Sequence, residues 1–203
     1  MKKLTIIAVM LIVSAAAFGQ SKFKFGVTAG MNLSKMDFKV ITSDSKIGWN
    51  AGFIGELSIA NNFYGNLSLL YSNKGYKLEE KDEGDKFITK QQANYIEVPL
   101  HIGYKLPVAE NISILGEAGP YAGFLVNAKW KEEDIYDGEK HKDSASNKDE
   151  FKKIDVGLGV KAGIEFSQRI RLTVGYDWGL ANLSKDGFKT HNRNFNVGMV
   201  LFF

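Results

Sequence analysis

The 203-residue sequence contains no cysteine and only three prolines. Without cysteine, the chain has no thiol nucleophile, disulfide, iron–sulfur cluster or cysteine-ligated zinc. It also lacks the HExxH, P-loop and calcium-loop spacings, and no long window follows a helical period. By contrast, glycine (21 residues), phenylalanine (14) and tyrosine (8) are plentiful. This composition favours strands and tight turns over a helical bundle.

The N-terminus has the three parts of an export signal. Lys2 and Lys3 precede an apolar run, 4–13, and Ala17-Phe18-Gly19 gives a small-x-small ending. A membrane anchor is the alternative, but a spanning helix needs about 20 apolar residues. We therefore predict a signal peptide over 1–19, cleaved after Gly19, and one domain over 20–203. Cleavage takes the basic residues from 26 to 24 against 23 acidic ones, which removes the electrostatic motive for nucleic-acid binding.

The rest of the chain alternates apolar and polar residues with period two, eight times. The segment 154–166 is the clearest, because isoleucine, valine, leucine, alanine and phenylalanine alternate there with glycine, Asp155, Lys161 and Glu165. In the fifth segment Leu115, Tyr121 and Leu125 break the pattern by falling in the polar phase. The eight predicted strands are centred on 23–34, 49–59, 63–72, 96–105, 112–127, 154–166, 170–180 and 195–203.

Strand length, connection length and charge placement favour a membrane barrel over a soluble β-sandwich or a lipocalin-like barrel. The strands reach the roughly 9–11 residues that cross a bilayer at a tilt. Mid-strand charges lie on the glycine-rich face, as expected if that face points inward. Short connections at 60–62, 107–111 and 167–169 alternate with long polar ones at 35–46, 77–91, 129–150 and 181–192. The sequence predicts an all-β, eight-stranded, antiparallel up-and-down transmembrane barrel with short periplasmic turns and four long extracellular loops.

Four segments resemble one family. Asn94-Tyr95-Ile96-Glu97-Val98-Pro99-Leu100 is similar to the Tyr-Leu-Glu-Ile-Pro-Leu signature of the small outer-membrane β-barrels common in Bacteroidota, often labelled porin-family or PorT-like. The strand motifs at 119–123, 155–166 and 176–180 resemble that family too, in the same order. The resemblance implies an eight-stranded barrel in the outer membrane of a Gram-negative cell, and no agreed activity.

The predicted barrel places ionisable side chains in its lumen, and eight strands enclose an interior just wide enough for side chains to fill. We predict a plug of ion pairs, with a narrow proton or small-ion path as the alternative. We expect His101 to pair with Glu97 or a neighbour, and Pro99 to cause a bulge or a local gap in the ladder. The predicted lumen network is Glu56, Glu97, His101, Lys105, Glu117, Asp155, Lys161, Glu165, Arg171 and Asp177.

Outside the lumen, two further sets of residues are singled out. Five aromatic residues are predicted to lie at the membrane interfaces: Trp49, Tyr71, Tyr104, Tyr176 and Trp178. Asp143-Ser144-Ala145 resembles the three-residue O-glycosylation acceptor described in Bacteroidota, which marks Ser144. The mixed charges of the second and third long connections read as solvated loop, with divalent-cation bridging to lipopolysaccharide as the alternative.

Three functions from different classes follow. The leading prediction is a non-enzymatic barrel that presents its loops for adhesion, envelope organisation or docking to a larger complex. The alternatives are a narrow porin-like conduit and an enzyme that modifies lipid or lipopolysaccharide. We predict no catalytic, metal or cofactor residues. The expected partners are outer-membrane lipid, lipopolysaccharide, the barrel-assembly machinery during biogenesis and a protein partner, but no nucleic acid.

Overall fold

A computed structural model describes residues 23–38, 44–82, 85–136, 139–148, 151–184 and 190–203. The predicted signal peptide and its cleavage site lie outside these residues. Within the described ranges, no helix is long and apolar enough to cross a membrane.

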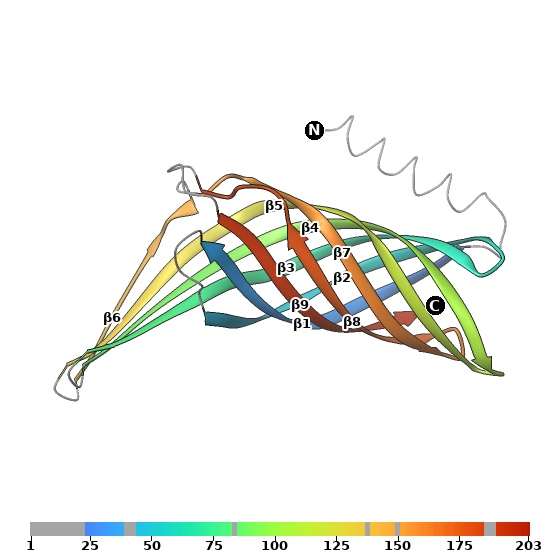
Figure 1. Ribbon diagram of the computed structural model, residues 1–203, viewed down its shortest axis with the longest axis horizontal. Coiled ribbons are helices and arrows are strands. Elements are labelled where there is room, and N and C mark those ends of the chain that lie inside the picture. Colours follow the sequence, from blue (N-terminus) through green and yellow to red (C-terminus); the bar gives the residue numbers. More distant parts are fainter. Residues whose placement is uncertain (1–22, 39–43, 83–84, 137–138, 149–150, 185–189) are drawn as a thin grey trace.

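Antiparallel strands make up the fold (Figure 1). They are β1 (Phe23–Phe38), β2 (Asp44–Ala60), β3 (Phe63–Asp82), β4 (Asp85–Ala109), β5 (Ile112–Tyr136), β6 (Glu139–Ser146), β7 (Ile154–Phe166), β8 (Ile170–Gly179) and β9 (Thr190–Phe202). Eight of them form a ring in the order β1-β2-β3-β4-β5-β7-β8-β9, which closes where β9 pairs with β1. The predicted eight-stranded antiparallel barrel is therefore confirmed.

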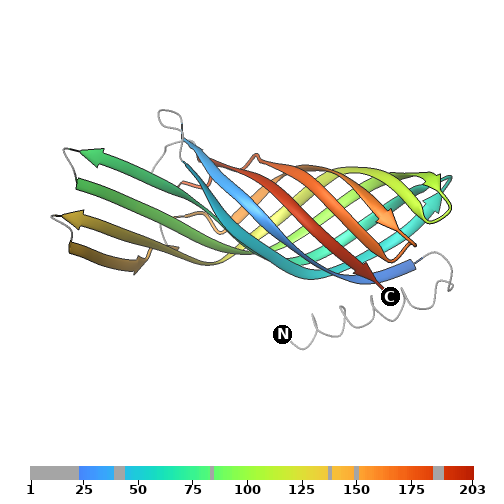
Figure 2. The same cartoon turned by 90° about the horizontal axis from the view of Figure 1, so that it is seen from below.

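The second and third long connections are paired strands, so their prediction as loops is wrong. β3 and β4 remain paired as far as Asp82 and Asp85, and β5 continues to Tyr136 before the chain returns as β6. We call the paired residues 76–82, 85–92, 129–136 and 139–146 the extension. It projects beyond the barrel at the end opposite the C-terminus (Figure 2). Mixed charge suggested solvated loop, but a hairpin outside the barrel, whose described side chains are mostly half-exposed or exposed, tolerates the same composition.

The short connections lie together at the other end, which we call the turn end. The β2–β3 turn is Asn61-Asn62, with φ of 48° and 72°, the left-handed values that a two-residue hairpin turn requires. Ser167 and Gln168 have φ of 48° and 58° in the β7–β8 turn. The C-terminus lies at the same end (Figure 1). Tight turns at one end and the extension at the other match the expected asymmetry.

Period-two alternation sorts the side chains between the outer surface and the lumen. On β7, Ile154, Val156 and Leu158 are exposed on the outside, whereas Asp155 and Glu165 are buried inside. The three residues that broke the pattern in the fifth segment, Leu115, Tyr121 and Leu125, are buried in the lumen phase as well. The barrel is thus apolar outside and mostly polar inside, the reverse of a soluble barrel.

Pro99 coincides with a break in the β3–β4 ladder. Pairing runs to Leu67 opposite Leu100 and resumes at Leu70 opposite Glu97, in the same register. Proline has no backbone N–H to donate, so the ladder loses pairs there without shifting. The local gap is confirmed. A β-bulge lies elsewhere, in β5, where Val126 is the extra residue between the pairs Asn94–Asn127 and Tyr95–Leu125.

Candidate functional site

A buried ion cluster occupies the turn-end half of the lumen. The Arg171 guanidinium pairs with Glu56 and donates to Glu165 Oε2, at 3.0 Å from Nε and 2.5 Å from Nη2. Lys105 Nζ lies 2.5 Å from Glu56 Oε1 and 3.0 Å from Glu165 Oε1. Glu56 is 0% exposed and Arg171 1%. These residues come from four strands whose lumen-facing phase meets at one level, so each buried charge has an opposite partner.

Glu117 joins this cluster to the middle of the lumen. It accepts hydrogen bonds from Tyr64 Oη at 3.0 Å and Asn66 Nδ2 at 2.7 Å. His101 Nδ1 lies 3.3 Å from Glu117 Oε1, and Lys161 Nζ lies 3.8 Å from the same oxygen. His101 therefore pairs with Glu117 and not with Glu97. We call Glu56, Lys105, Glu117, Lys161, Glu165 and Arg171 the turn-end cluster.

Gly103 makes the room that Tyr64 needs beside Glu117. A Cβ at residue 103 would lie 2.4 Å from Tyr64 Cζ and 2.6 Å from its hydroxyl oxygen. The ring of Tyr64 also lies under two cations, with Lys105 Nζ 4.8 Å and Arg171 Cζ 5.1 Å from its centroid. The glycine on one strand thus lets an aromatic ring from the next strand reach the centre of the cluster.

The other half of the lumen, toward the extension, is called the loop-end half, and its carboxylates are held mainly by amides. Asp155 Oδ2 accepts from Asn192 Nδ2 at 2.8 Å, and Asp177 Oδ2 accepts from Asn194 Nδ2 at 3.0 Å. Glu97 is the exception, since it pairs with Lys74, which is 1% exposed. Sequence analysis placed Glu97, Asp155 and Asp177 in the lumen but missed Lys74. The signal was available, because Lys74 continues the inward phase of β3 beyond the point where we ended the strand.

Apolar side chains close the lumen above these carboxylates. Phe151 and Leu183 come from the connections on either side of the β7–β8 hairpin, and Phe151 forms an isolated bridge with Ser184. Leu183 is fixed by its backbone, whose carbonyl accepts from Lys152 N at 2.9 Å. We call this buried group the lumen cap: Met36, Ala93, Tyr95, Leu125, Ala128, Phe151 and Leu183. Sequence analysis did not find the cap, because isolated apolar residues in polar connections carry no periodic signal.

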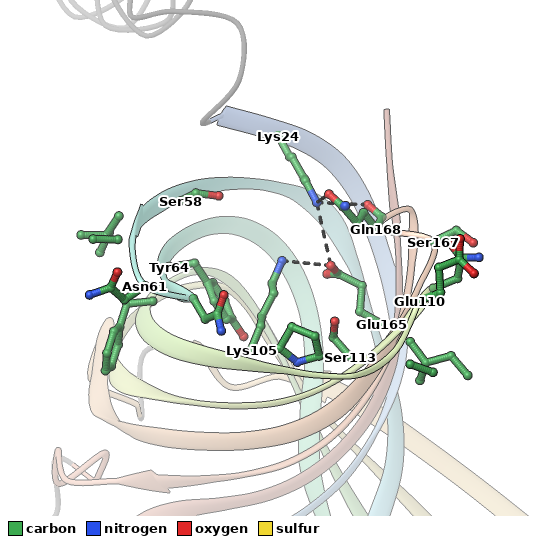
Figure 3. A pocket seen from close by; sticks show the side chains of 18 residues that line it. Lys24, Ser58, Asn61, Tyr64, Lys105, Glu110, Ser113, Glu165, Ser167 and Gln168 are labelled. Atoms are coloured by element: carbon green, nitrogen blue, oxygen red, sulfur yellow. Dashed lines mark hydrogen bonds and ion pairs between the residues drawn. The ribbon is translucent and has the colours of Figure 1, made fainter.

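A cavity of about 800 Å³ opens at the turn end of the lumen, directly below the turn-end cluster. Figure 3 shows Lys24, Lys105 and Glu165 facing one another across it, with Tyr64 on one wall and Gln168 on the other. Lys24 Nζ donates to the Gln168 carbonyl at 3.3 Å and to Gln168 Oε1 at 3.1 Å. We call this cavity the vestibule. Two cavities of about 40 and 30 Å³ lie deeper in the lumen, each large enough for ordered water.

The predicted interfacial aromatics lie on the outside in pairs. The tilted rings of Trp49 and Tyr71 have centroids 5.5 Å apart, and those of Tyr176 and Trp178 have centroids 4.8 Å apart, both toward the loop end. Tyr104 contacts Phe63 at 4.9 Å beside the β2–β3 turn. Their membrane role stays a prediction.

Ser144 is exposed on β6, and its N–H donates to Asp143 Oδ1 at 2.7 Å. Among the described residues, no group of three or more His, Asp or Glu side chains is arranged to hold a metal ion.

A closed antiparallel ring with an apolar exterior and a charged, filled interior defines the class of small outer-membrane β-barrels. The chain belongs to the family described as outer membrane protein beta-barrel domain, whose model matches residues 18–185. It is therefore an outer-membrane protein. The narrower Bacteroidota or PorT-like assignment remains a resemblance.

Solved structures of other small barrels are similar to the chain. Ail of Yersinia pestis is 14% identical over 90% of this chain and 99% of its own, with a TM-score of 0.45. Neisserial surface protein A is 14% identical over 88% of this chain and 97% of its own, with a TM-score of 0.48. OprG of Pseudomonas aeruginosa is 13% identical over 89% and 94%, with a TM-score of 0.41. No curated protein sequence matches the chain.

Proposed function

We propose that this barrel is a non-enzymatic scaffold that holds the extension outside the outer membrane, where β6 docks an extended segment of another envelope protein. The observation that carries this proposal is the open edge of β6. In the described chain β6 pairs with β5 on one side and has no strand on the other. An unpaired edge presents backbone N–H and C=O groups that a partner strand can match.

The filled lumen supports docking over conduction. The turn-end cluster satisfies its charges internally, and the lumen cap closes the loop end with apolar side chains. A narrow conduit needs a continuous polar path, and the cap interrupts it. The competing conduit function predicts conductance steps in planar bilayers, whereas the scaffold gives none above background.

The direction of the β6 hydrogen bonds identifies which residues face a partner. Asn147 N donates to Ala128 O at 3.2 Å, which makes this a hydrogen-bonded pair. Antiparallel ladders alternate, so Ala145 and Asp143 point their N–H groups toward β5, and Ser144 and Ser146 point theirs outward. The outward N–H of Ser144 is met by its neighbour Asp143, a contact that a docking strand would replace.

Single substitutions on β6 test the edge. Ser144→Pro removes an outward N–H without removing a β5–β6 hydrogen bond, so it should abolish capture of the partner from native membranes. Ser144→Ala keeps the N–H and is the matched control. Both variants should keep the heat-dependent gel shift of a folded barrel. Equal capture by wild type and Ser144→Pro, with both folded, would exclude β6 as the docking edge.

Shortened hairpins extend the test. Replacing residues 131–144 with Asn-Gly keeps the Trp130–Ala145 pair and the Asn147–Gln91 hydrogen bonds, and removes most of β6. Replacing 79–88 with Asn-Gly shortens the β3–β4 hairpin above the Leu78–Thr89 pair and leaves β6 in place. The first change should remove the partner and the second should not.

Several finer features belong to the same proposal. We infer a mature N-terminus at Gln20, insertion by the barrel-assembly machinery, and contact of the outer surface with phospholipid and lipopolysaccharide. The paired aromatics on the outside support the lipid contact, because Trp and Tyr favour membrane interfaces. The intact mass of the envelope form tests the cleavage site. It also tests O-glycosylation of Ser144, since a glycan adds mass to the wild type and not to Ser144→Ala.

A further inference from the structure

We propose that the vestibule is a binding site for an oxyanion, a carboxylate or a phosphate, carried by a molecule on the periplasmic side. Its volume of about 800 Å³ falls within the usual range for ligand pockets, about 300–1,000 Å³. It lies at the turn end, which faces the periplasm in barrels of this class. The site is at the opposite end from β6 and is independent of docking there.

The cationic groups of the vestibule are accessible, and their carboxylate partners are not. The side chains of Lys24 and Lys105 are 25% and 16% exposed, whereas those of Glu165 and Glu56 are 2% and 0% exposed. A solute entering the vestibule therefore meets ammonium groups first. The other acid in the lining, Glu110, is solvated on the β4–β5 turn at the rim.

Each of the two ammonium groups has a hydrogen-bond donor to spare. An ammonium group has three N–H donors. Lys24 gives two hydrogen bonds to Gln168, and Lys105 gives one each to Glu56 and Glu165. Both nitrogens lie within 4 Å of the same oxygen, Glu165 Oε1. They are therefore close enough together for a single oxyanion to accept from both.

Lys24 adds a positive charge beside a cluster whose buried charges are already balanced. The turn-end cluster holds three cations, Lys105, Lys161 and Arg171, against three carboxylates, Glu56, Glu117 and Glu165. Lys24 adds a fourth cation, and the fourth acid, Glu110, is solvated at the rim. Buried and half-buried charges are normally balanced. An anion bound beside Lys24 offsets this added positive charge inside the vestibule.

Neutral polar groups around the mouth suit a polar carrier for that anion. The rim carries hydroxyl and amide side chains from all three turns and the strand ends beside them, together with the Tyr64 ring: Ser58, Asn61, Asn62, Asn111, Ser113 and Gln168. Such groups bind peptide and sugar moieties through hydrogen bonds. The ligand class is thus a small polar molecule that ends in a carboxylate or a phosphate.

A titration on the folded barrel tests the site. The ¹⁵N-labelled protein in nanodiscs is titrated separately with N-acetyl-D-alanyl-D-alanine, its uncharged C-terminal amide and inorganic phosphate. We expect saturable shifts of the Asn61, Ser113 and Gln168 signals with an anionic probe, and none with the amide. Lys24→Gln should weaken that binding by about tenfold, since one charged hydrogen bond is lost. Lys152→Gln, the same charge change at the opposite mouth, should leave it unchanged.

Each outcome of the titration either assigns the source of the anion or overturns the proposal. Saturation with the dipeptide alone assigns a carboxylate source, saturation with phosphate alone assigns a phosphate source, and saturation with both assigns a general oxyanion site. The proposal is overturned by the absence of saturable shifts, by an equal response to the uncharged amide, or by a Lys24→Gln affinity equal to that of the wild type. Lys24 lies at the rim, and the gel shift verifies that its variant folds.

Discussion

The two halves of the lumen are filled by different chemistry. In the turn-end half, strand residues from β2, β4, β5, β7 and β8 pair opposite charges directly, with Arg171 and Glu165 as cross-strand partners. In the loop-end half, amides hold two of the three carboxylates, and residues from connections add an apolar cap. The first half is thus fixed by the strands themselves, whereas the second depends on where the connections fold back.

This difference indicates which half fixes the barrel and which half can vary. Removing one partner from the turn-end cluster leaves a charge unpaired in a low-dielectric interior, which lowers the free energy of unfolding considerably. Losing one cap residue leaves an apolar cavity, whose cost depends on how far the neighbours relax. Three tests change residues of the two halves, and a fourth changes the extension for comparison.

Arg171→Met should have the largest effect. It leaves Glu56 and Glu165 without their main partner, and breaking a buried pair costs about 3–5 kcal/mol. Urea unfolding in micelles, followed by the gel shift, should show a large decrease in the midpoint. Val174→Leu on the adjacent outer surface is the control and should change little. If the two variants unfold alike, the assignment of inside and outside on β8 is wrong by one residue.

Leu183→Ala should cost less, about 2–3 kcal/mol, because it deletes a fully buried apolar side chain that lies in a connection and not in a strand. The same variant removes part of the apolar barrier that the cap places across the lumen. Bilayer conductance is therefore recorded alongside unfolding. Leu180→Ala, at an exposed position nearby, is the control. An unchanged midpoint would mean that the cap does not stabilise the loop-end half.

The double change Lys74→Met with Glu97→Leu should be nearly neutral, within about 1 kcal/mol. Replacing both members of a buried ion pair with apolar groups removes the desolvation cost and the attraction together. Lys74→Met alone leaves the buried Glu97 carboxylate unpaired and should be clearly worse. A double-mutant cycle measures the coupling, and additive effects of the two single variants would contradict a direct interaction.

Lys77→Gln in the extension should have the smallest effect. Its hydrogen bond to Glu79 raises the pKa of Lys77, so the contribution is present below the ordinary lysine pKa and is lost as the pH rises through the higher folded value. Both side chains are partly exposed, and solvent screens the pair. Unfolding curves of wild type and variant should therefore coincide from pH 7 to 9, and a resolved shift there would indicate that the extension is more closely packed than described.

Sequence reasoning found the features that repeat and missed those that occur once. The period-two alternation predicted the eight strands of the ring. It also predicted that Glu56, Glu165 and Arg171 face inward, since every second residue of a strand shares a face. The alternation could not predict the partner of His101, because that partner depends on the register between neighbouring strands. The extension was missed because a hairpin outside the barrel and an irregular loop can have the same mixed-charge composition. The lumen cap was missed because Phe151 and Leu183 are single apolar residues in connections.

The pairing of β1 with β9 has a consequence for how the chain acquires its fold. The other strand pairs of the ring join strands that follow each other in sequence or are separated only by the short β6, but Gly26 pairs with Phe202 and Phe38 with Thr190. Contacts of such large sequence separation are the slowest to form, because the chain entropy must be lost first. Until β9 reaches β1, the sheet has two open edges at which another unfinished copy can pair. During assembly in the membrane, ring closure therefore competes with edge-to-edge association. The rate at which β9 pairs with β1 determines how much of the chain forms closed barrels.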